Sequence, residues 1–170
     1  MAFIQENHIT HLNKDPTYLF QKQIQQALQK CNTLVEKSKH KYLINIKPMA
    51  SSLNACIKTH KHDEPIRMVI KNIQAPSYRT AKFLNKKLQS LIDLLDTYTT
   101  KNSHEVAQEL HSNRINKNHR IITPDIKDLY VNILIQTILR ITKFWLNKRN
   151  CDSATTEQTL CHLEIILKQN

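Results

Sequence analysis

A carboxylate at the end of a short apolar run is the residue of this chain whose type and position could best do chemistry. The β-branched residues Ile121, Ile122 and Thr123 precede Asp125, and Tyr130 follows five positions after the acid. A strand holds its backbone in a defined direction, so an acid at its end can present a carboxylate as a metal ligand. The same spacing also suits a strand that simply ends in an Asp turn. The spacing alone leaves both interpretations open.

Four segments, taken in order along the chain, resemble parts of one known protein family. The residues around Asp125 resemble the first catalytic motif of retroelement reverse transcriptases, in which a strand-end Asp is followed five positions later by Tyr or Phe. Three upstream segments resemble the same family in the same order, namely Ile57–Lys61, Glu64–Ile70 and Gln74–Leu84. The resemblance is closest to Penelope-like and related retrotransposons without long terminal repeats, and it covers about residues 40 to 150.

The resemblance implies a nucleotidyltransferase, an RNA-directed DNA polymerase that uses two divalent metal ions about 3.5–4 Å apart. It assigns a Mg²⁺ carboxylate to Asp125, with the main-chain carbonyl of Ile126 beside it, and places Tyr130 under the sugar of the incoming deoxynucleoside triphosphate. It gives no catalytic role to Asp128, because a role in a turn or as a helix cap is enough to explain this residue. It assigns triphosphate contacts to three cations of the fingers, Lys58, Lys61 and Arg67.

The chain departs from the family's pattern at several points. No Asp-Asp pair and no glycine occur in the 170 residues, so the second catalytic block and the Gly-rich motif of the family are both missing. Met68 and Leu134 stand where the family usually has proline. Pro124 stands where the family has an apolar residue, and it removes a hydrogen-bond donor directly beside Asp125. These departures predict a truncated, inactive fragment.

Composition favours a polyanionic partner. The length suits one domain with a real core, since a chain of this size removes about 70% of its unfolded surface from water. Lys+Arg 25 against Asp+Glu 14 leave a net charge of +11, which favours nucleic acid or an anionic membrane surface over a merely solvated face. The lack of glycine, against about 7% in typical proteins, excludes the Gly-rich phosphate loops of P-loop and dinucleotide-binding proteins.

Two stretches without acids carry the excess cations. Residues 37 to 61 hold six lysines, and residues 65 to 92 hold six further cations. After Pro76 an apolar helical stripe begins, and three cations recur beside it at three- to four-residue spacing, so they line up on one exposed side. Such a row suits a run of phosphates, and we expect an RNA or RNA–DNA hybrid to bind there. The three cations are Arg79, Lys82 and Lys86.

Targeting and thiol signals predict an intracellular protein of the cytoplasm or nucleus. Residues 1 to 8 lack the features of a signal peptide, and no apolar run reaches the roughly 18 residues of a membrane span. We therefore expect no membrane partner. The four cysteines show no Cys-x-x-Cys spacing, and a zinc site built from Cys151, Cys161 and His162 would lack a fourth ligand. Reduced thiols are the better interpretation.

Periodicity predicts the elements that position these residues. Strands are expected over 65–70 and in the run that leads to Asp125, whereas residues 37 to 61 are expected to be mostly loop. The fold class is α+β and helix-dominated, with an N-terminal helical segment, residues 1–40, and a partial reverse transcriptase domain, residues 41–170. That domain comprises the fingers and the first part of the palm, with a small incomplete sheet. Helices are expected over 16–38, from Pro76 to about Leu95, over 102–111, from Ile133 to about Asn147, and from Thr155 onward.

Two other functions remain open. The first alternative is a non-catalytic basic helical module that binds nucleic acid through the two cationic stretches without a metal. The second is a helical protein–protein interaction domain, which would explain the amphipathic helices but not the charge.

Overall fold

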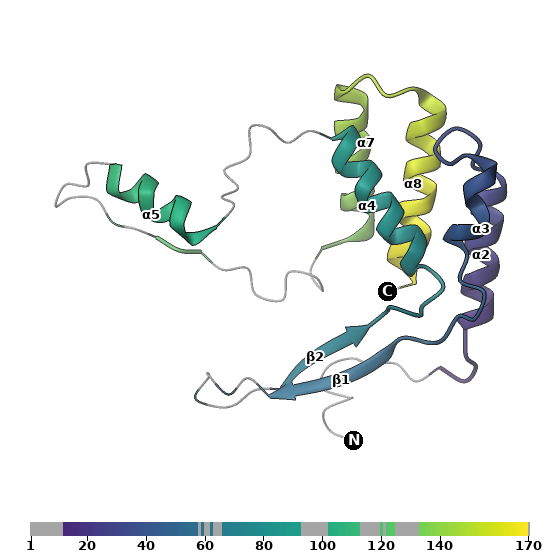
Figure 1. Cartoon of the computed structure of the whole chain (residues 1–170), viewed down its shortest axis with the longest axis horizontal. Coiled ribbons are helices and arrows are strands. Elements are labelled where there is room, and N and C mark those ends of the chain that lie inside the picture. Colours follow the sequence, from purple (N-terminus) through teal and green to yellow (C-terminus); the bar gives the residue numbers. More distant parts are fainter. Residues whose placement is uncertain are drawn as a thin grey trace.

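The computed structural model describes residues 12–57, 59, 62, 66–92, 102–112, 120, 122–124 and 133–169. Within these ranges the protein consists of six α-helices, one 3-10 helix and a two-stranded antiparallel sheet (Figure 1). The helix-dominated α+β class expected from the sequence is therefore confirmed. No helix in the described ranges is long and apolar enough to cross a membrane.

Helix α8, Ser153–Lys168, is the element on which the others pack. Three helices lie against it, namely α2 (Thr17–Gln29), α4 (Tyr78–Leu91) and α7 (Ile135–Lys148), as Figure 1 shows. Each buried aliphatic side chain stabilises this packing by about 1.5–3 kcal/mol before the entropy cost of ordering it. The fully buried apolar cluster comprises Ile24, Leu28, Cys31, Leu34, Val35, Leu84 and Ile166.

Helix α2 ends earlier than periodicity predicts. The expected helix ran to residue 38, whereas α2 ends at Gln29 and the chain turns before the 3-10 helix η1, Lys37–Lys39. Gln158 of α8 holds this turn, because its side-chain oxygen accepts the main-chain N–H groups of Thr33 at 3.1 Å and Leu34 at 2.9 Å. These donors are satisfied from outside, so the turn can be buried without helical hydrogen bonds.

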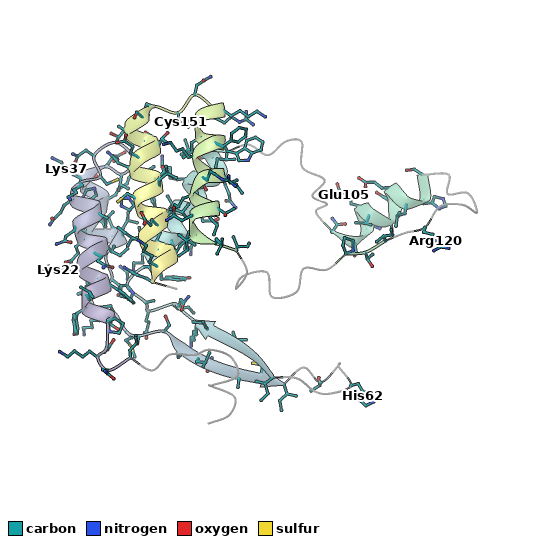
Figure 2. All side chains as sticks on the ribbon, turned by 180° about the vertical axis from the view of Figure 1, so that it is seen from behind. Lys22, Lys37, His62, Glu105, Arg120 and Cys151 are labelled. Carbon is teal, nitrogen blue, oxygen red and sulfur yellow. The ribbon has the colours of Figure 1, made fainter. Side chains whose placement is uncertain are left out.

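A β-hairpin extends from the helices. Strand β1, Ser52–Ile57, pairs antiparallel with β2, Ile66–Lys71, in a register that runs from Ser52 opposite Lys71 to Ile57 opposite Ile66. His62, in the connection, lies at the far end of the hairpin (Figure 2). The expected strand at 65–70 is confirmed, whereas the expected loop up to residue 61 is wrong where β1 forms. Strand β1 depends on pairing with a distant segment, which local turn signals do not report.

Side-chain caps explain where helices α5 and α8 begin. Helix α5, Ser103–Ser112, begins as predicted, because the side-chain oxygen of Asn102 accepts the N–H of Glu105 at 3.0 Å. It lies apart from the helices around α8 in Figure 1. Helix α8 begins two residues before the predicted start, because Asp152 caps it by accepting the N–H of Thr155 at 2.8 Å.

The apolar run before Asp125 does not form the expected strand where the structure describes it. Ile122 and Thr123 belong to no regular element, and Ile122 is exposed. The sheet in the described ranges contains β1 and β2 alone. Pro124 follows directly and cannot donate to a strand ladder, which weakens pairing at this point.

Candidate nucleic-acid interface

Helix α4 separates an apolar side from a cationic side. Thr80 and Leu84 are buried on the side that faces the core, and Ala81 and Leu88 are partly buried with them. Four cations occupy the solvent side, because they fall between the apolar positions of a helix with 3.6 residues per turn. These exposed cations are Arg79, Lys82, Lys86 and Lys87. The exposure predicted for Arg79, Lys82 and Lys86 is confirmed, and their contact with nucleic acid stays a prediction.

The charge of this side is not neutralised within the described part of the protein. The ion pairs given between two described residues are Lys39–Glu36 and Lys168–Glu164, neither of which involves α4. Helix α4 contains no acid of its own. Lys82 and Lys86 therefore present ammonium groups to solvent without a carboxylate partner in the described residues. Clustered free cations create the positive potential that attracts a polyanion.

Arg79 differs from the two lysines because it also joins α4 to helix α3, His40–Leu43. Its Nη1 donates to the main-chain carbonyl of Ile44 at 3.2 Å and, more weakly, to that of Tyr42 at 3.5 Å. The carbonyls at the end of a helix lack helical partners, so a guanidinium is well suited to them. Arg79 thus positions α3 as well as contributing charge.

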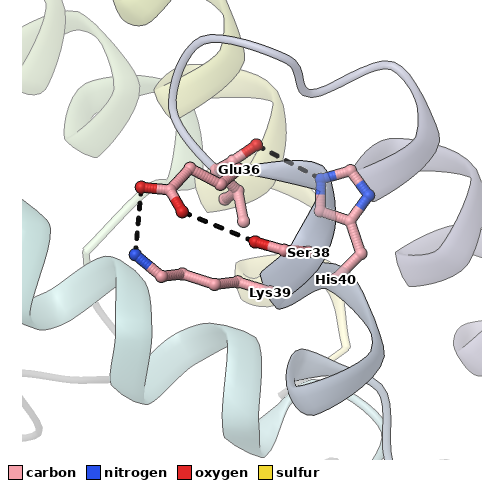
Figure 3. A network of polar contacts seen from close by, with 5 residues as sticks. Glu36, Ser38, Lys39 and His40 are labelled. Carbon is pink, nitrogen blue, oxygen red and sulfur yellow. Dashed lines mark hydrogen bonds and ion pairs between the residues drawn. The ribbon is translucent and has the colours of Figure 1, made fainter.

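The segment that carries α3 is held from several sides. The Nε2 atom of His40 lies 3.1 Å from the carbonyl oxygen of Cys31 and 3.3 Å from that of Val35. Figure 3 shows the neighbouring contacts, in which Lys39 and Ser38 approach the carboxylate of Glu36. These contacts link η1 and α3 to the turn after α2.

The chain that follows α3 is fixed in the same way. Gln21 of α2 donates to the carbonyl of Asn45 at 2.7 Å, and the Asn45 side chain donates to the carbonyl of Gln74 at 2.8 Å. The main-chain N–H of Met49 donates to the same Gln74 carbonyl at 2.9 Å. Residues 37–49 are therefore tied to α2, to α4 and to the turn that precedes α4.

Sequence reasoning did not single out Tyr42, which lies on this segment. Its residue surface is 65% exposed, and the Nζ atom of Lys41 lies 5.1 Å from the centroid of its ring. An available signal was the aromatic residue within a lysine-rich stretch that has no acid. Only the structure shows that Tyr42 lies beside Arg79 of α4.

The polymerase site expected from the resemblance is not brought together by the described residues. Lys58, Lys61, Asp125, Ile126 and Tyr130 lie outside them. Arg67 belongs to β2, opposite Cys56 of β1, but its side chain is outside the description. Among the described residues no group of three or more His, Cys, Asp or Glu side chains is arranged to hold a metal ion. The Mg²⁺ site therefore remains an expectation from the resemblance.

A second surface feature is an open groove of about 450 Å³ between α7 and α8. Arg140 and Lys143 line it from α7, and Glu157 and Glu164 line it from α8. Because its charges are mixed, this groove does not extend the cationic side of α4.

Comparisons of the chain with protein-family models, curated proteins and solved structures found no match.

Proposed function

We propose that this chain is a fragment of a retroelement reverse transcriptase, its fingers and first palm motif, that binds RNA or an RNA–DNA hybrid. The observation that carries the binding is the pair of unneutralised lysines on the exposed side of α4, Lys82 and Lys86. The support for the polymerase origin is the order of the four family-like segments, which ends at Asp125. The fragment is inactive on its own, because it contains no Asp-Asp motif.

The spacing on α4 suits a phosphate backbone. Lys82 and Lys86 are four residues apart, so their Cα atoms are separated by about 6 Å along the helix axis and share one side. Neighbouring phosphates of one strand can then be contacted by successive lysines. The binding energy comes largely from the release of counterions, which makes the affinity depend on salt and hardly on base sequence.

The test is the salt dependence of binding to a fluorescein-labelled RNA and an RNA–DNA hybrid. The dissociation constant should rise with salt, with a slope of about 0.7–0.9 per neutralised phosphate in a log–log plot. The double variant Lys82→Glu, Lys86→Glu should weaken binding to all sequences alike and reduce that slope by about 1.5. Arg79 is left intact, because its removal would also release α3.

The matched control is the double variant Lys143→Glu, Lys148→Glu on α7, which changes the net charge equally at exposed positions of another helix. It should retain most of the affinity. A flat salt response, or an equal loss in both double variants, would show that the α4 side is not the binding site.

A further inference from the structure

The cationic side of α4 continues onto α3, where an aromatic ring is exposed. Arg79 reaches the carbonyl oxygens of Tyr42 and Ile44, and the hydroxyl of Thr80 donates to the carbonyl of Leu43 at 3.4 Å. Lys82 lies one turn further along α4, on the same side as Arg79. Helices α3 and α4 thus adjoin through these main-chain contacts, with an exposed tyrosine on α3 and the cations Arg79 and Lys82 on α4.

We propose that Tyr42 is a stacking platform for one unpaired base of a single-stranded nucleic acid, whose phosphates follow Arg79, Lys82 and Lys86. This inference rests on the proposed function and adds the form of the ligand and the residue that contacts a base. Proteins that bind single strands combine a cationic track with aromatic rings on which bases stack, whatever the base sequence.

The ring of Tyr42 is exposed, and a lysine lies over one of its faces, so a base would stack on the other. Lys41 places its ammonium group 5.1 Å from the ring centroid, an arrangement in which a cation is attracted to one ring face. With 65% of Tyr42 exposed, the ring retains a large solvent surface for a base. A base stacked on it would be held by dispersion and apolar contact, and the nearby cations would hold its phosphate.

Hydrogen bonds hold the backbone on both sides of Tyr42. His40, directly before Lys41, contacts the turn after α2, and Asn45, three residues after Tyr42, is held by Gln21 and contacts Gln74. Binding therefore requires little ordering of the backbone around the ring, and less of the interaction energy is lost to entropy.

The interior bases of a duplex already stack on both neighbours, so the body of a duplex cannot offer a base face to Tyr42. An unpaired base can reach the ring at any position along a strand, which is why the inferred ligand is a single strand or the single-stranded overhang of a hybrid. The body of a duplex can contact only the cations.

The experiment uses the full chain and two fluorescein-labelled probes of equal length, an oligothymidine strand and an abasic deoxyribose–phosphate strand. Tyr42→Ala should weaken oligothymidine binding by about tenfold, since one aromatic–base stack is typically worth that much, and should leave abasic binding unchanged. Tyr42→Phe should bind both probes like the wild type, because it keeps the ring. Phe144→Ala, which removes an exposed ring from α7, is the matched control and should change neither affinity.

An equal effect of Tyr42→Ala on both probes, or no effect on either, would overturn the inference. Should Tyr42→Ala lose helicity by circular dichroism, Tyr42→Leu decides, because it keeps an apolar side chain on α3 but has no ring. The failure of the proposed function looks different, because Lys82→Glu, Lys86→Glu would then leave binding to the abasic strand unchanged.

Discussion

At the scale of single residues, Gln158 joins α8 to the turn after α2, and His162 of the same helix is buried beside it. The side-chain oxygen of Gln158 accepts two main-chain N–H groups and lies 3.3 Å from the thiol sulfur of Cys31. One turn later His162 is only 2% exposed, and its Nδ1 lies 2.8 Å from the carbonyl oxygen of Gln158. Its Nε2 is buried without a hydrogen-bond partner among the described residues. Such a ring is stable only when it is neutral.

The neutral His162 predicts a stability that depends on pH. Burial lowers the pKa of His162 below its ordinary value, and His40 nearby lowers it further, while the Gln158 contact partly opposes this. The unfolded chain therefore binds more protons at mildly acidic pH, so the free energy of unfolding falls as pH drops below the ordinary histidine pKa of about 6.5. Urea unfolding should show lower stability at about pH 5.5 than at about pH 7.5.

The variant His162→Gln should reduce this pH dependence, whatever its effect on stability at neutral pH. His111→Gln, an exposed position at the end of α5, serves as the control and should leave the pH dependence unchanged. A stability that is equal at both pH values in the wild type would contradict the role given to His162.

At the scale of elements, the hairpin has an apolar face that no described helix covers. Four large aliphatic side chains on this face, at the pairs Leu53–Ile70 and Ile57–Ile66, are each between 48% and 61% exposed. An isolated two-stranded hairpin is marginally stable in water, and open strand edges can pair with other chains. The hairpin is therefore the element most prone to self-association.

Replacing one cross-strand pair should reduce this association. The variant Leu53→Thr, Ile70→Thr places β-branched side chains suited to a strand at both positions but removes apolar surface, so light scattering at rising protein concentration should fall relative to the wild type. Thermal unfolding of the helices should change little, because neither residue belongs to the buried cluster. Ser52→Thr, Asn54→Thr on the opposite face is the control. A wild-type chain that stays monomeric at every concentration would contradict this prediction.

At the scale of the whole molecule, the proposal separates binding from catalysis. The proposed binding residues lie on α4 and α3, whereas the expected catalytic carboxylate, Asp125, belongs to a different part of the sequence that carries one family-like motif without its partner. Phosphoryl transfer with two metal ions needs several converging carboxylates. The chain contains no Asp-Asp pair to provide them.

Primer extension by the purified chain should therefore remain at background, and Asp125→Asn should not change it. When the chain is fused to the Asp-Asp-containing remainder of a retroelement reverse transcriptase, any DNA synthesis should be lost on Asp125→Asn and kept on the control Asp128→Asn. If the chain is instead a non-catalytic binding module, the fusion should synthesise no DNA. Synthesis by the chain alone, lost on Asp125→Asn, would disprove the proposed truncation.

The sequence by itself determined the features that depend on local periodicity and caps. Helices α4, α5 and α7, strand β2 and the exposure of Arg79, Lys82 and Lys86 all follow from residues three to four apart or from neighbouring turn signals. Spacing reports which side of a segment is buried, but it does not report the path of the chain.

Only the tertiary structure decided the features that depend on contacts between distant segments. Gln158 contacts a turn about 125 residues earlier and holds it where periodicity would continue the helix. Strand β1 forms because it pairs with β2. Tyr42 lies beside Arg79 because the Arg79 guanidinium donates to the main-chain carbonyl of Tyr42, 37 residues earlier in the chain. Such contacts are set by packing and by the need to satisfy buried polar groups, and neither is encoded in any local window of residues.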